Sequence, residues 1–144
     1  MSTKELQDGI VENMKKWQHV EDASVASTGR AIEKTRNPVI RMVMEIIQRD
    51  SLMHYRTQQM ITDSFTQTIS LSPDELGEVW DLIENHIKIE KKTIELANQT
   101  LELLKGKKMV VQEYLLNYLM QDEKKHDTLL EQLEGIKKGM YPGG

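Results

Sequence analysis

The sequence predicts an all-α protein of four long helices, and three observations support this. Glu, Lys, Leu, Gln and Met are plentiful and form helices well, whereas the 144 residues include only three prolines. Turn signals are few, and they divide the chain into four long segments. Apolar residues in these segments recur in steps of three and four, the spacing with which helices pack in bundles. A chain of this length is expected to form one domain, residues 1–144.

The turn signals set the expected helix limits. Asn37 precedes Pro38, and proline suits the first helical position after an Asn cap. A capping box with proline at its first helical position begins at Ser72, and Gly106 is a natural helix C-cap. The expected helices cover residues 4–34, 38–63, 73–105 and 109–137, and a segment rich in Gly and Pro, 139–144, follows them.

The two halves of the chain resemble each other weakly. A displacement of 72 residues pairs Asp50 with Asp122 and His54 with His126, and many apolar positions coincide as well. The halves are therefore interpreted as a duplicated helical hairpin.

Ionisable residues interrupt the apolar stripes of the last two expected helices. Glu90 lies in the stripe of one helix, and Asp122, Glu123 and His126 lie in the stripe of the other. A buried carboxylate without a partner costs several kcal/mol, so these side chains should be paired, protonated or bound to a metal. A Glu-x-x-His sequence places an oxygen and a nitrogen ligand one turn apart, and Glu90 on a facing helix supplies another oxygen. A metal ion would satisfy all of them together.

This pattern resembles the ferritin-like di-iron carboxylate family, rubrerythrins included, in which each helix hairpin gives one Glu and one Glu-x-x-His motif. The helix layout matches along nearly the whole chain, and the motif is matched fully only in the second half. The resemblance implies that Glu90, Glu123 and His126 bind the metal. It also implies a non-haem iron protein that uses one or two ions with oxygen or peroxide, with manganese or zinc as other possible metals.

The first half departs from the family motif. Under the same displacement, Gln18, Ser51 and His54 occupy the three ligand positions, so only the histidine remains. Glu21 lies one turn beyond Gln18, and Asp50 lies one turn before His54. Glu21, Asp50 and His54 are therefore further candidate ligands.

Several nearby residues are candidates for supporting roles. We expect Asp122 to orient His126 by accepting a hydrogen bond from its second ring nitrogen. His86 lies one turn before Glu90 and offers another nitrogen, and His19 adjoins the apolar stripe of the first helix.

The family resemblance implies an up-down-down-up bundle, which needs a crossover after the second helix. That helix would be about 39 Å long, whereas an extended segment 64–72 reaches about 30 Å. The segment is rich in Ser, Thr and β-branched residues, which suits an extended crossover. The alternative is a simple up-down-up-down bundle.

Composition excludes several other classes of function. No cysteine is present, so thiolate metal sites and thiol nucleophiles are absent. The net charge of −4 and the mixing of lysine with glutamate predict no nucleic-acid surface. No apolar run suits a membrane span or secretory signal, so a cytoplasmic location is expected.

The sequence leaves two functions open and identifies no electron donor. Beside the metal protein stands a helical structural or interaction module that has lost catalytic competence, its polar residues forming a buried network. Whether the protein is an enzyme therefore stays undecided. In either case, an apolar face containing Met42, Met44 and Met60 suits a homodimer.

Overall fold

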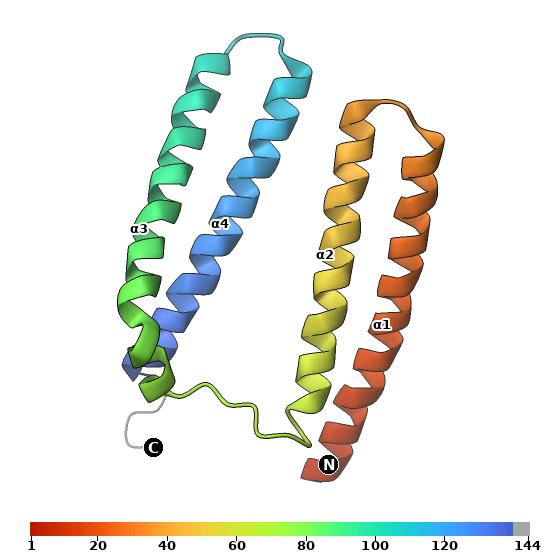
Figure 1. The fold of residues 1–144 in the computed structure, drawn as a ribbon, viewed down its shortest axis with the longest axis vertical. Coiled ribbons are helices and arrows are strands. Elements are labelled where there is room, and N and C mark those ends of the chain that lie inside the picture. The colour runs from red at the N-terminus through yellow and green to blue at the C-terminus, as the bar shows by residue number, and fades with distance from the viewer. Residues whose placement is uncertain (140–144) are drawn as a thin grey trace. The chain divides into compact units, whose positions relative to one another are not determined.

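The structure is a computed structural model in which residues 1–139 are described, and they form four helices without a β-strand (Figure 1). The all-α fold class predicted from the sequence is therefore confirmed. Within the described residues, no helix combines the length and apolarity that a membrane crossing requires. Most of the expected Gly- and Pro-rich terminal segment lies outside the described residues. The helices are α1 (Thr3–Lys34), α2 (Pro38–Asp63), α3 (Pro73–Leu104) and α4 (Val110–Gly139).

Local sequence signals fix the ends of these helices. The side chain of Asn37 accepts hydrogen bonds from the backbone N–H groups that open α2, at 2.9 and 3.1 Å. At the start of α3, the Ser72 hydroxyl accepts a hydrogen bond from the Glu75 N–H at 3.2 Å and donates one to the Glu75 carboxylate at 2.8 Å. Gly106 follows α3 with a φ of 77°, a left-handed conformation that glycine adopts readily. These ends lie within two residues of the expected limits.

The chain divides into two compact units, each a pair of packed helices. The first unit, Met1–Ser70, contains α1 and α2, and the second begins at Leu71 and contains α3 and α4. The turn between the two helices of each unit is short, so each unit is a helical hairpin (Figure 1). Segment 65–72 is not helical, as the crossover requires. One domain over residues 1–144 and the up-down-down-up order stay predictions.

The interior of the second hairpin follows the predicted stripe of α3. Ile87, Glu90 and Ala97 are buried, and the remaining members of that stripe are half-buried. The apolar neighbours of Glu90 along the seam therefore keep most water from its side chain.

The predicted stripe of α4 is partly wrong. The expected stripe also includes Leu119 and Leu129, one turn to either side of Asp122 and His126, but these residues are 49% and 56% exposed, whereas neighbouring Met120 is only 6% exposed. The apolar arc of α4 is wide enough that either of two adjacent stripes can pack inward, and the turn of α4 against α3 selects the one with Met120. Glu123 follows Met120 by three residues and therefore lies on the same side of α4, beside His126 as expected.

The interior of the first hairpin is polar. Its fully buried residues are Gln18, Glu21, Thr28, Ser51 and Gln58, and none of them is apolar. Hydrogen bonds satisfy several of these groups, which is the usual condition for burying them. The two hairpins therefore differ in interior chemistry despite their similar sequence pattern.

Candidate metal centre

Three metal-ligating side chains converge inside the second hairpin. Glu90 comes from α3, while Glu123 and His126 come from α4, one turn apart. One ligand atom from each lies within 4.8 Å of those of the other two. Across residues 1–139 no other set of three His, Asp or Glu side chains meets this condition. The helix pair thus brings together the three residues in which the sequence matches the family motif.

His126 has two different neighbours at its two ring nitrogens. Nδ1 lies 3.5 Å from Oε1 of Glu90 and 3.7 Å from Oε2 of Glu123. Nε2 lies 3.3 Å from Oδ2 of Asp122, whose other oxygen pairs with Lys125 at 2.9 Å. A carboxylate at one ring nitrogen fixes the orientation and tautomer of an imidazole, and leaves the other nitrogen to bind a metal. Asp122 thus lies where the sequence predicts a partner that orients His126.

Glu90 is the most enclosed member of the cluster. Its residue is 6% exposed, and its Oε1 lies 2.9 Å from Nε2 of His86 on the preceding turn of α3. Its second oxygen, Oε2, is buried and has no hydrogen-bond partner. Buried carboxylate oxygens are seldom left without a partner, because the loss of water is then uncompensated.

Glu123 has a neighbour that the sequence did not suggest. The hydroxyl of Thr93 on α3 lies 3.0 Å from Oε2 of Glu123 and 2.7 Å from the backbone carbonyl oxygen of Glu90. No sequence motif marks a threonine inside a helix. The contact is found only in the structure, which places Thr93 opposite Glu123 across the hairpin. His86 was visible in the sequence by its spacing of one turn from Glu90.

The two carboxyl groups influence each other. A hydrogen bond shared with Glu90 raises the pKa of Glu123, and burial raises it further. The same hydrogen bond lowers the pKa of Glu90, helped by the nearby His86 and His126 and opposed by burial. The proximity of the two carboxyl groups disfavours double ionisation, and Glu123 is the harder of the two to ionise.

The residues of this cluster fit a divalent metal ion. Two carboxylates and one imidazole nitrogen form a donor set that iron, manganese and zinc all accept. The buried, unpartnered Oε2 of Glu90 offers a lone pair that no protein group uses. A cation would also offset the repulsion between the two carboxylates, which raises the pKa of Glu123.

The candidate ligands of the first half are only partly brought together. Glu21 is 6% exposed, and its Oε2 lies 3.1 Å from Nδ1 of His54 without hydrogen-bond geometry. Asp50 is half-buried on α2 and does not join them in a cluster of three. The first hairpin therefore offers one carboxylate and one imidazole in contact.

Neutral groups occupy the other two motif positions of the first hairpin. Gln18 donates hydrogen bonds from Nε2 to the Tyr55 carbonyl oxygen at 3.3 Å and to Oε1 of Gln59 at 3.1 Å. The hydroxyl groups of Ser24 and Ser51 lie 2.8 Å apart. These contacts satisfy Gln18 and Ser51 without a cation, so this hairpin stays packed although neither position holds a glutamate.

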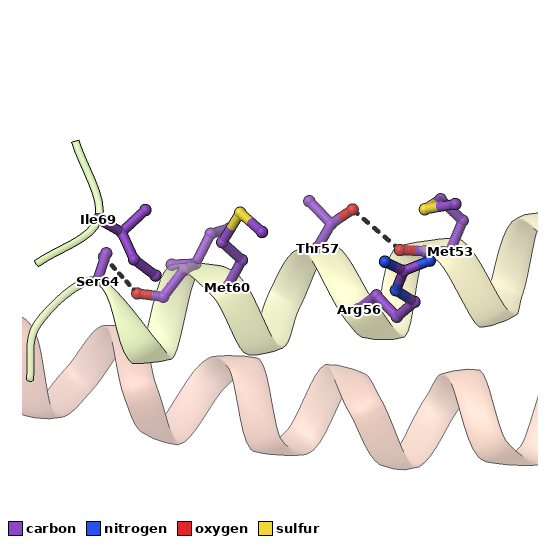
Figure 2. A pocket seen from close by; sticks show the side chains of 7 residues that line it. Met53, Arg56, Thr57, Met60, Ser64 and Ile69 are labelled. Carbon is purple, nitrogen blue, oxygen red and sulfur yellow. Dashed lines mark hydrogen bonds between the residues drawn. The ribbon is translucent and has the colours of Figure 1, made fainter. Parts of the chain in front are cut away.

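The first hairpin also has a pocket, and its lining is mostly apolar, unlike the metal cluster. Figure 2 shows this pocket, of about 330 Å³, along α2 and the segment that follows it. The hydroxyl of Thr57 donates to the Met53 carbonyl oxygen, and that of Ser64 to the Ile61 carbonyl oxygen, so both are turned toward the backbone. With Met60 and Ile69 also in its wall, the pocket is apolar and contains no metal ligand set.

Comparison of this chain with models of known protein families, with characterised proteins and with solved structures gives no match.

Proposed function

We propose that the protein binds a divalent metal, with iron as the physiological ion, in a site of the ferritin-like kind within its second hairpin. The observation that carries this proposal is the convergence of Glu90, Glu123 and His126 within 4.8 Å. Asp122 behind His126 adds support, because metal-binding histidines usually donate their second N–H to such a carboxylate. The ferritin-like assignment rests on the sequence motif and on the all-α fold together.

The donor set favours iron over softer metals. It contains two carboxylates, one imidazole and no thiolate, and oxygen-rich sites with few nitrogens suit iron and manganese better than copper. Three protein ligands leave coordination positions open to water, oxygen or peroxide. Bound iron would supply one-electron chemistry with oxygen or peroxide, which is the basis for proposing an oxidoreductase or peroxide-handling activity.

The chain's own residues would prepare this site in stated ways. Asp122 holds the His126 ring so that Nδ1 faces Glu90 and Glu123. Glu123 binds the cation in its ionised form, because a ligating carboxylate must be ionised. The apolar side chains next to Glu90 limit access of water to the ligands.

Metal content of the purified protein tests the proposal directly. Protein produced in iron-supplemented medium, and a metal-free sample titrated with Fe²⁺, Mn²⁺ or Zn²⁺ without oxygen, should each contain close to one ion per chain. One ion corresponds to the site of the second hairpin. Two ions per chain would assign a second position to Glu21 and His54, with Asp50 as a further ligand. Protein that retains no ion, and whose thermal stability ignores all three metals, would refute the proposal.

The pH dependence of binding should reveal the protonation of Glu123. Since the pKa of Glu123 is raised above its usual value, protonation of this carboxylate competes with metal binding at low pH, and affinity should increase with pH until the pH exceeds that raised pKa. The expected control is Glu123→Gln, which binds more weakly and has a smaller slope of log affinity against pH, by up to about one proton. Equal slopes for the two proteins would show that Glu123 releases no proton on binding.

A second candidate function is a structural or interaction module without metal. The observation that favours it is that the cluster is partly satisfied by itself: Glu90 contacts His86, and Glu123 contacts Thr93. The metal titration separates the two functions, because a module of this kind gains no stability from any ion at concentrations that load a specific site.

We also propose a homodimer, supported by apolar side chains exposed along α2. Of the methionines expected in the dimer face, Met42 and Met60 are more than half exposed, whereas Met44 is half-buried. Met53 is also more than half exposed, and methionine adapts well to a partner surface. The molar mass in solution, compared between the natural chain and Met60→Glu, tests this: a charge in such an interface should shift the protein toward monomer.

A further inference from the structure

One histidine contacts the metal cluster without belonging to it. His86 lies on α3, one turn before Glu90, and its Nε2 lies 2.9 Å from Oε1 of Glu90. Its side chain is 53% exposed, so it approaches the carboxylate from the solvent side. The set of mutually close ligand atoms comprises Glu90, Glu123 and His126, without His86.

The chemistry of this contact defines what His86 can do. An ionised carboxylate only accepts hydrogen bonds, so Nε2 of His86 must donate its proton to Oε1 of Glu90. A ring nitrogen that carries a proton has no free lone pair for a metal. Oε1 is thereby engaged, whereas the buried Oε2 of Glu90 has no partner. The two oxygens of one carboxylate are thus made unequal.

We propose that His86 is a positioning residue that holds the Glu90 carboxylate in place by donating a hydrogen bond from its Nε2–H to Oε1. This inference rests on the proposed metal-binding function and adds a residue that the Glu and Glu-x-x-His pattern does not contain. A hydrogen bond of this kind restricts the rotation of a glutamate side chain and reduces the ordering required when the ion binds. Thr93 contacts Glu123 in a similar way, because the Thr93 hydroxyl lies 3.0 Å from Oε2 of Glu123.

Cobalt(II) binding to the full-length chain tests the proposal, because its visible spectrum reports the ligands and its affinity is easily measured. Three variants are compared with the natural chain: His86→Ala removes the donor, His86→Gln keeps an N–H donor at similar reach, and His19→Ala removes an exposed imidazole of the first hairpin. Circular dichroism of the metal-free proteins checks that all are folded. Loss of an outer hydrogen bond to a ligand typically weakens metal binding about 10- to 100-fold.

The expected result is weaker cobalt binding by His86→Ala in that range, affinity within about threefold of the natural chain for His86→Gln, and no change for His19→Ala. The cobalt spectra of His86→Gln and the natural chain should coincide, since no ligand is exchanged. Equal affinity of His86→Ala and the natural chain would overturn the proposal while leaving the metal site intact. A Gln variant as weak as the Ala variant, with an altered spectrum, would make His86 a direct ligand and also overturn it. If the natural chain binds no cobalt, both the metal function and the role of His86 fall.

Discussion

His126→Ala and Glu123→Ala are each expected to weaken metal binding by more than about 100-fold. Loss of an outer partner of a ligand already costs about 10- to 100-fold, and the loss of a direct ligand should exceed that. Each variant removes one of only three protein donors in the cluster. Both side chains are partly exposed, so truncation should leave α4 folded. Isothermal titration of metal-free protein with Fe²⁺ or Co²⁺ measures the change.

The first hairpin supplies matched controls for these variants. Ser51 and His54 occupy the positions of Glu123 and His126 under the displacement of 72 residues. Ser51→Ala and His54→Ala should change the affinity for the first ion by less than about threefold, because the ion binds within the second hairpin. If His54→Ala weakens binding as much as His126→Ala, the two histidines share one site and the single-hairpin site is wrong.

Glu90→Met is expected to abolish metal binding while changing the free energy of unfolding of the metal-free protein by less than about 1 kcal/mol. Removal of a buried carboxylate saves the cost of taking it out of water. This gain is opposed by the loss of the contacts with Glu123 and His86, which lower the pKa of Glu90 and so favour its ionised form in the folded protein. The groups that lose their partner can reach water: the side chains of His86, His126 and Glu123 are 53%, 40% and 24% exposed. The buried, unpartnered Oε2 of Glu90 is removed as well.

Urea unfolding in the presence of a chelator, with and without added metal, measures both effects. Gln18→Met is the matched control, because Gln18 is the buried equivalent of Glu90 in the first hairpin. This neutral side chain donates two hydrogen bonds, so its loss should destabilise the protein by about 1 kcal/mol. A metal-free Glu90→Met protein less stable than the natural chain by more than about 1 kcal/mol would mean that the contacts of Glu90 with its histidines outweigh its burial. In that case the cluster has a structural value of its own, as the alternative function requires.

The effects of Glu90→Met on metal binding and on the stability of the metal-free protein together distinguish a functional site from a structural network. A side chain that adds little stability when metal is absent and is essential for binding when metal is present is typical of a binding site, because the bound ion then supplies the stabilisation. At a metal concentration 100 times the dissociation constant, the natural chain should gain about 2.7 kcal/mol that Glu90→Met does not gain.

Much of this molecule was accessible from the sequence by itself. Asn37, Ser72 and Gly106 determined where helices begin and end, because capping acts over one turn of chain. The step of three and four residues placed Glu90 in the seam of α3, and the spacing of Glu123 and His126 placed them on adjacent turns of α4. All of these are relations between residues no more than four positions apart.

The tertiary structure decided what depends on how one helix is turned against another. It placed Met120 inside and Leu119 outside, and it brought Thr93 to Glu123 across the hairpin. It also joined Glu21 to His54, while Gln18 and Ser51 found neutral partners. The rotation of a helix about its axis is set by the fit of two side-chain surfaces, and a broad apolar arc permits more than one setting. The spacing of residues along the sequence therefore indicated the candidate ligands, and the packing of the helices determined which neighbouring side chains contact them.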